Sequence, residues 1–191
     1  MGRPATLSAV VVPVEAAEHV VAEHRRRLDP SAPWGVPAHV TVLVPFVPPA
    51  AIDDAVLARL GAALATVEPF DCVFAGCAWF DDRVLWLAPE PAAPFRALTA
   101  AVVAAFPDHP PYGGAFDDVV PHLTVGERPR ATLADLRTAE AAVAPRLPVH
   151  ARVDRVLLMT GSHDADSWRT VHEFALRTGL VQASRPPKSP D

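Results

Sequence analysis

PAHVTVLVPF (residues 37–46) is echoed later in the chain by VPHLTVGERP (residues 120–129), and each stretch holds a His-x-Thr step shortly after a proline. The steps are His39 with Thr41, and His122 with Thr124. Side chains alternate between the two faces of a β-strand, so each step projects an imidazole and a hydroxyl from one face and leaves apolar side chains on the other. A lone histidine on a strand is more often a structural residue, but the repetition predicts a site built from both copies.

Hydrophobic periodicity places the two stretches in a repeated order of elements. In the first half we expect strands over residues 7–14, 38–44 and 70–79, and helices over 16–28 and 50–67. In the second half we expect strands over 83–87, 121–125 and 150–160, helices over 94–106 and 133–146, and an added strand over 168–176. Each half therefore reads β-α-β-α-β, which predicts an α+β fold.

This order predicts a single bilobal domain over residues 1–182, with pseudo-repeat halves at about 5–80 and 81–180. The polar, proline-rich end over residues 183–191 is expected to be a disordered tail. Packing of the halves about a pseudo-twofold axis would turn both His-x-Thr steps toward a common cleft.

The composition limits the partners that the protein can have. The formal net charge of the 191 residues is −5, so no broad basic surface is expected for long nucleic acid, and an RNA terminus or a small nucleotide is the expected partner. The apolar run over residues 9–14 is too short for a membrane span or a signal peptide. Cys72 and Cys77 lack the spacing of a zinc knuckle. We expect a cytoplasmic monomer with no membrane association.

Two imidazoles on either side of a phosphorus atom can divide acid–base chemistry between them. One takes a proton from the attacking hydroxyl or water, while the other gives a proton to the leaving oxygen. The hydroxyls of Thr41 and Thr124 are placed to donate hydrogen bonds to the non-bridging phosphate oxygens. This chemistry needs neither a metal nor another cofactor. We therefore take His39, His122, Thr41 and Thr124 as the candidate catalytic residues.

These motifs resemble those of the two-histidine (2H) phosphoesterase superfamily, specifically the bacterial 2′-5′ RNA ligase-like proteins. That family has two H-x-[ST] motifs, which HVT at residues 39–41 and HLT at residues 122–124 match. The resemblance implies a bilobal fold with antiparallel sheets around a pseudo-twofold cleft. It also implies cyclic phosphodiesterase activity on 2′,3′-cyclic phosphate ends, sometimes with reversible joining of RNA ends through a 2′-5′ linkage.

The chain departs from close relatives of the RNA ligase type after the second motif. Those relatives often carry an arginine soon after it, whereas here Val125, Gly126 and Glu127 come before Arg128. Arg128 is therefore a candidate for binding the reacting phosphate or a neighbouring one.

An insertion over residues 107–120 lies just ahead of the second motif. It contains the pair Gly113 and Gly114, flanked by Tyr112 and Phe116, which suggests a loop that approaches a ligand closely. Tyr112 and Phe116 are therefore candidates for contacting a nucleobase. A plain turn whose aromatic side chains enter the core is the alternative.

Two other functions are compatible with these residues. His39 and His122 could bind a metal together with His109, or with His163, Asp164 and Asp166, although no His-x-x-x-His spacing is present. A nucleotide-binding module that keeps the fold without turnover is the second alternative. The run Arg25 to Arg27 is expected to be a solvated helix end, where positive charge suits the helix dipole.

Overall fold

The computed structural model describes residues 4–115 and 119–177 of the chain. The strands are β1 (Leu7–Pro13), β2 (His39–Leu43), β3 (Phe70–Phe80), β4 (Val84–Glu90), β5 (Leu123–Glu127), β6 (Val149–Val153), β7 (Arg155–Gly161) and β8 (Arg169–Ala175). The α-helices are α1 (Glu15–Leu28), α2 (Asp54–Leu64), α3 (Ala93–Ala105) and α4 (Leu133–Val143). Short 3₁₀ turns are η1 (Ala32–Trp34), η2 (Pro49–Ala51), η3 (Pro111–Gly114) and η4 (Ala144–Arg146). No helix in these two ranges is long and apolar enough to cross a membrane.

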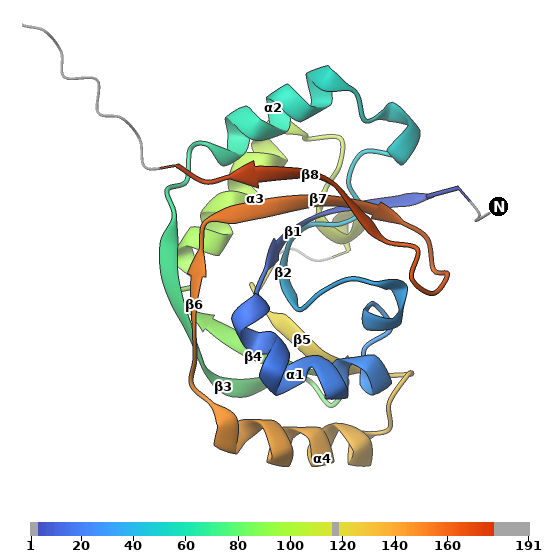
Figure 1. Ribbon diagram of the computed structural model, residues 1–191, viewed down its shortest axis with the longest axis vertical. Helices are drawn as coiled ribbons and strands as arrows, with labels where there is room; N and C mark the ends of the chain where they lie inside the picture. The colour runs from blue at the N-terminus through green and yellow to red at the C-terminus, as the bar shows by residue number, and fades with distance from the viewer. Residues whose placement is uncertain (1–3, 116–118, 178–191) are drawn as a thin grey trace, which may run out of the picture.

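The strands form two four-stranded sheets, with the orders β2-β1-β7-β8 and β5-β4-β3-β6, and every neighbouring pair is antiparallel (Figure 1). The predicted α+β fold with two antiparallel sheets is confirmed. Each sheet contains strands from both halves of the chain, because β3 from the first half pairs with β4, and β7 from the second half pairs with β1. The edge strands β2 and β5, which pair with β1 and β4, carry the two His-x-Thr steps in corresponding places.

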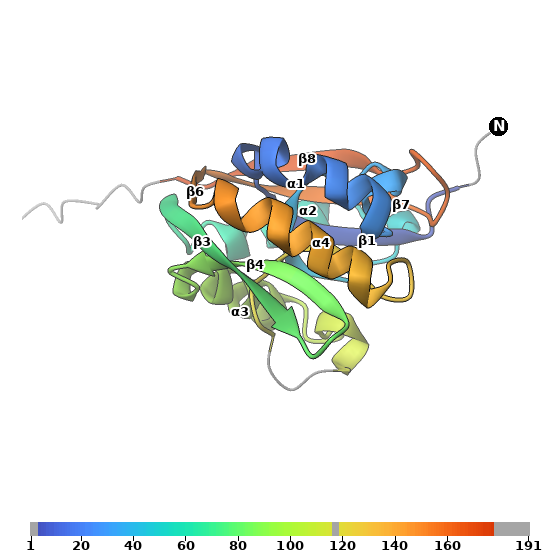
Figure 2. The ribbon, with the colours of Figure 1, turned by 90° about the horizontal axis from the view of Figure 1, so that it is seen from below.

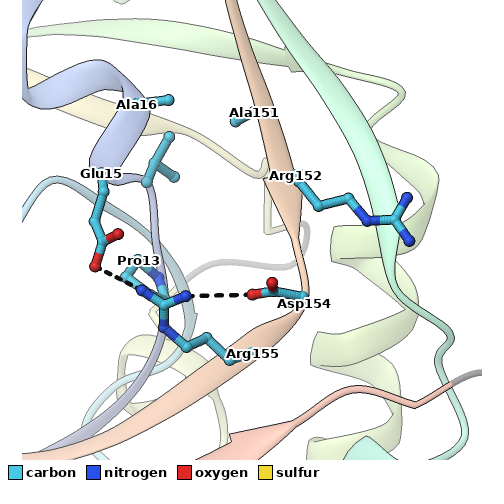
Figure 3. Close-up of a pocket in the computed structure, with 8 residues that line it drawn as sticks. Pro13, Glu15, Ala16, Ala151, Arg152, Asp154 and Arg155 are labelled. Carbon is cyan, nitrogen blue, oxygen red and sulfur yellow. Dashed lines mark hydrogen bonds and ion pairs between the residues drawn. The ribbon is translucent and has the colours of Figure 1, made fainter.

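The prediction of one strand over residues 150–160 is wrong. The segment divides at Asp154 into β6, which pairs with β3, and β7, which pairs with β1 in the other sheet. The side chain of Arg155 holds this crossover by bonding to Asp154 and to Glu15 at the start of α1 (Figure 3). No glycine or proline interrupts residues 149–160, which is why the sequence pattern alone suggested a single strand.

The helices of the two halves pack together in pairs. Helices α1 and α4 lie side by side and cover the sheet β5-β4-β3-β6, whereas α2 packs on α3, and α3 packs on β2 (Figures 1 and 2). The helix predicted over residues 50–67 is shorter in the structure, since α2 begins after Asp53, whose side chain accepts a hydrogen bond from the backbone N–H of Val56. This capping carboxylate separates α2 from the preceding turn η2.

Gly126 in β5 permits the close approach of α1 to the second motif strand. A Cβ atom at this position would lie 2.6 Å from Cβ of Leu28 and 2.9 Å from Cδ2 of Leu136. Both distances are shorter than packed carbon atoms allow, so any side chain here would push α1 or α4 away. The absence of a side chain brings the end of α1, including Asp29 at its C-cap, close to the motif strands.

Candidate active site

His39 and His122 are held in the same way on the two sheets. His39 is the first residue of β2, and His122 directly precedes β5. Nδ1 of His39 lies 2.7 Å from the carbonyl oxygen of Pro37, and Nδ1 of His122 lies 2.7 Å from that of Val120. A carbonyl oxygen can only accept, so each Nδ1 carries the proton and donates it. The neutral imidazoles therefore keep the lone pair on Nε2 for a substrate proton.

Burial lowers the pKa of both histidines, because it disfavours the charged imidazolium. The pKa of His39 falls to about 4, first through burial and then through the nearby Arg25 guanidinium, and charge on His122 lowers it further. The carbonyl hydrogen bonds oppose this effect at both histidines. Both imidazoles are consequently neutral at neutral pH in the free protein, and an anionic ligand between them would favour their protonation.

Thr41 and Thr124 share one half-buried face of their strands with the histidines. In each strand the alternate residues are buried, namely Val40, Val42, Leu123 and Val125, so the threonines and histidines face away from the core. Tyr112 adjoins the first motif, since its phenol interacts with the Thr41 side chain, which opposes the rise that burial causes in the phenol pKa, and its backbone N–H donates to the carbonyl oxygen of Val44 at 2.6 Å. The insertion that contains Tyr112 is thereby attached to β2.

A cleft of about 730 Å³ opens beside His122. It is lined by Trp79, Phe80, Asp81, Arg83, Val84, Tyr112, Val119, Val120, His122 and Glu127. The ring of Phe80 meets the His122 imidazole edge-on with a centroid separation of 5.0 Å, and it stacks on Trp86 at 4.7 Å. The cleft therefore combines the His122 imidazole with an apolar, aromatic wall of the kind that accommodates a nucleobase.

Of the predicted site residues that the structure describes, His122 and Tyr112 line this cleft, whereas His39, Thr41, Thr124 and Arg128 are not among its lining residues. Arg128 is exposed, forms an ion pair with Asp82 at 3.1 Å, and lines a separate surface cavity with Thr132 and Leu133. Phe116 lies outside the residues that the structure describes. Tyr112 does line the cleft, but its phenol also interacts with Thr41, which the loop composition did not indicate.

The residues considered as alternative metal ligands each have contacts of their own in the structure. His109 packs near the ring of Phe46 at 6.1 Å, and His163 is exposed and contacts Trp34 at 4.7 Å. The carboxylate of Asp164 accepts a hydrogen bond from Ser162 within the β7–β8 turn. Within residues 4–115 and 119–177, no group of three or more His, Cys, Asp or Glu side chains is arranged to hold a metal ion.

Arg25, which lies near His39, is buried in the structure. The expectation of a solvated helix end is wrong for this residue, because Arg25 is only 2% exposed and forms an ion pair with Asp29, which is 3% exposed. The sequence did contain a signal, since Arg25 lies four residues after Val21 and three before Leu28 on the buried stripe of α1. Asp29 in turn helps burial to raise the pKa of Glu127 in the cleft wall.

Two His-x-Thr steps on corresponding strands, with imidazoles that are anchored alike and lie close enough for charge on His122 to lower the pKa of His39, are the arrangement that characterises the 2H phosphoesterases. The family model of the 2′-5′ RNA ligase superfamily matches residues 12–165. The chain belongs to this superfamily, and it is a phosphoesterase-type enzyme by family.

Solved structures agree with this assignment. The Thermus thermophilus protein TT0787 is similar with a TM-score of 0.58 and 23% identity, over 90% of this chain and 98% of that one. Escherichia coli LigT, solved in complex with NADP+, is similar with a TM-score of 0.56 and 16% identity, over 92% of this chain and 100% of that one. At these identities the likeness establishes a shared fold. No curated protein matches the sequence.

Proposed function

We propose that the protein is a metal-independent phosphodiesterase that opens 2′,3′-cyclic phosphates on RNA ends or small nucleotides, or cleaves 2′-5′ linkages. The observation that carries this proposal is the matched anchoring of the two imidazoles, each through Nδ1 to the carbonyl two residues earlier. That anchoring supports a mechanism in which both Nε2 atoms act on one phosphate. Family membership supports phosphoester chemistry independently.

In the proposed reaction, Nε2 of one histidine takes a proton from water as the oxygen attacks phosphorus. Nε2 of the other, protonated histidine gives its proton to the ribose oxygen as the P–O bond breaks. Thr41 and Thr124 donate hydrogen bonds to the non-bridging oxygens, where negative charge shifts in the transition state. If a ribose hydroxyl attacks in place of water, the same groups join two RNA ends through a 2′-5′ linkage.

A nucleotide is the ligand that suits the cleft best. Its aromatic wall, formed by Phe80 and Tyr112, offers surfaces on which a base can stack, whereas the ring of Trp79 is turned to α4, where it contacts Arg137 and Glu140. Structures of the fold relative LigT with 3′-AMP, with ATP and with NADP+ support a small-nucleotide ligand here as well. Arg128 and Phe116 remain candidate substrate contacts in this proposal, the former for a phosphate outside the cleft.

The test is a substrate screen of the purified protein. It compares 2′,3′-cyclic mononucleotides, RNA with a cyclic phosphate end and 2′-5′-linked dinucleotides, each with and without a strong chelator. We expect turnover that the chelator leaves intact. Activity that is lost with chelator and restored by a divalent cation would favour the metal alternative, and nucleotide binding without turnover would favour the non-catalytic module.

A further inference from the structure

A buried ion pair lies beneath His39 and has no part in the chemistry described above. The guanidinium of Arg25 bonds to the Asp29 carboxylate through Nε at 2.9 Å and through Nη2 at 2.8 Å. A buried pair of this kind is costly to desolvate and adds little to stability compared with apolar residues of similar size. Its position beside a candidate catalytic histidine therefore points to a local role.

The same guanidinium fixes the segment that leads into β2. Arg25 donates to the carbonyl of Val36 at 3.3 Å and to the hydroxyl of Ser31 at 3.1 Å. Asp29 accepts from the backbone N–H of Ser31 at 2.9 Å and from its hydroxyl at 2.8 Å. Val36 directly precedes Pro37, whose carbonyl anchors His39, so the ion pair sets the position of that anchor.

The two histidines differ in the charges that face them. His39 is faced by Arg25 and Asp29 from the end of α1 and by His122 from the other sheet, and Arg25 is the strongest of these influences. For His122, burial is what lowers the pKa, and no arginine contributes in the part of the chain that the structure describes. The positive charge therefore distinguishes two imidazoles that are otherwise anchored in the same way.

We propose that Arg25, held in place by Asp29, is a positioning residue for His39 that makes the two catalytic histidines chemically unequal. It fixes the carbonyl anchor of the His39 imidazole and makes this imidazole the weaker base of the two and, once protonated, the stronger acid. The pair thereby separates the proton affinities that an acid and a base working together require. This inference rests on the proposed function for its catalytic meaning.

The first test is an NMR titration of the histidine rings in the full chain, which can be read in the absence of any activity. Removing both charges together, in Arg25→Met with Asp29→Leu, avoids leaving one buried charge unpaired. The pKa of His39 should rise from about 4 but stay below 6.5, because burial remains. The pKa of His122 should change less. An unchanged His39 titration in this folded variant would overturn the proposal.

The second test separates position from charge. Arg25→Lys keeps the positive charge but cannot span Asp29, Ser31 and the Val36 carbonyl, because an ammonium lacks the planar fork. His39 should then titrate as in the wild-type protein, while kcat/KM falls about tenfold or more because the anchor shifts. Unchanged kcat/KM in both Arg25 variants would also overturn the proposal.

Arg155→Met is the matched control. Arg155 forms ion pairs with Glu15 at the opposite end of α1 and with Asp154, away from the cleft (Figure 3). This variant should leave the His39 titration and kcat/KM at wild-type values, and losses equal to those of the Arg25 variants would reduce Arg25 to a general packing role. If the wild-type protein turns over no substrate, the proposed function alone is wrong, and the titration still decides whether Arg25 controls His39.

Discussion

The backbone N–H of Tyr112 donates to the carbonyl oxygen of Val44 at 2.6 Å and its phenol interacts with the Thr41 side chain, so an aromatic residue of the insertion adjoins a hydroxyl of the first His-x-Thr step. Two roles for Tyr112 can now be separated, namely stacking on a base and orienting Thr41. Because Phe keeps the ring, Tyr112→Phe should leave nucleotide affinity near the wild-type value. It should lower kcat about two- to tenfold, the range of a single net hydrogen bond.

Tyr112→Ala provides the comparison, since it removes both the ring and the hydroxyl. If the ring stacks on the base, this change should weaken nucleotide binding about tenfold or more, in line with stacking worth roughly 1–3 kcal/mol. Calorimetric binding and steady-state kinetics on both variants separate the two roles. A wild-type kcat in Tyr112→Phe would show that the hydroxyl of Tyr112 does not orient Thr41.

The two histidines should contribute to turnover as a pair, so that loss of either one removes most of the activity. His39→Ala and His122→Ala should each lower turnover by roughly two to four orders of magnitude, because each removes one proton-transfer group. The double variant should be little worse than the worse single variant, since neither group works alone. Kinetics on 2′,3′-cyclic nucleotides check this, with thermal unfolding as the control for folding. A folded single variant near wild-type activity would contradict the two-histidine mechanism.

The buried His39 should also make the free energy of unfolding depend on pH. Its pKa is about 4 in the folded protein and 6.5 in the reference state, so between these values the unfolded chain binds a proton that the native state does not. Stability is therefore highest above pH 6.5 and falls as the pH drops toward 4, by up to about 3 kcal/mol from this residue. Urea unfolding at pH 7 and pH 5 measures the change, and His39→Gln should reduce the difference.

The sequence predicted those parts of the fold in which a local pattern and the tertiary structure agree. The apolar residues opposite His39 and His122 are buried as strand alternation requires. Thr132 and Asp135 form a reciprocal capping box at the start of α4, a feature that four consecutive residues are enough to encode. Both features are local, since a strand face or a helix cap needs only a few neighbouring residues.

The incorrect predictions, of one strand over residues 150–160 and of an exposed Arg25, concern features that depend on tertiary contacts. The chain crosses between sheets at Asp154 because β6 and β7 find partners in β3 and β1, more than sixty residues away. Arg25 is buried because Asp29, Ser31 and Val36 satisfy its guanidinium, whereas helix-end statistics describe an exposed arginine. Periodicity places Arg25 on the buried stripe of α1, but it identifies neither the groups that satisfy its charge nor the strands with which β6 and β7 pair.

Gly126→Ala should lower both the free energy of unfolding and the activity, because Gly126 allows the end of α1 to lie close to the motif strands. The added Cβ would meet Leu28 and Leu136 within 3 Å, so α1 or α4 must move, at a cost of about 1–3 kcal/mol in the free energy of unfolding. Gly76→Ala in β3 of the same sheet is the matched control, because its Cβ would meet no atom within 4 Å. Its stability should stay within about 1 kcal/mol of the wild-type value, since alanine is at least as favourable as glycine in a strand.

The same displacement should reach His39, because Leu28 adjoins Asp29, which holds Arg25 and Ser31. We therefore expect Gly126→Ala to lower kcat/KM on a 2′,3′-cyclic nucleotide about tenfold at a temperature where the variant is fully folded, and Gly76→Ala to leave it unchanged. Urea unfolding and kinetics on the two variants provide the comparison. A variant at Gly126 that loses stability but keeps full activity would show that the end of α1 moves without disturbing His39, and would break the proposed connection between this contact and the site.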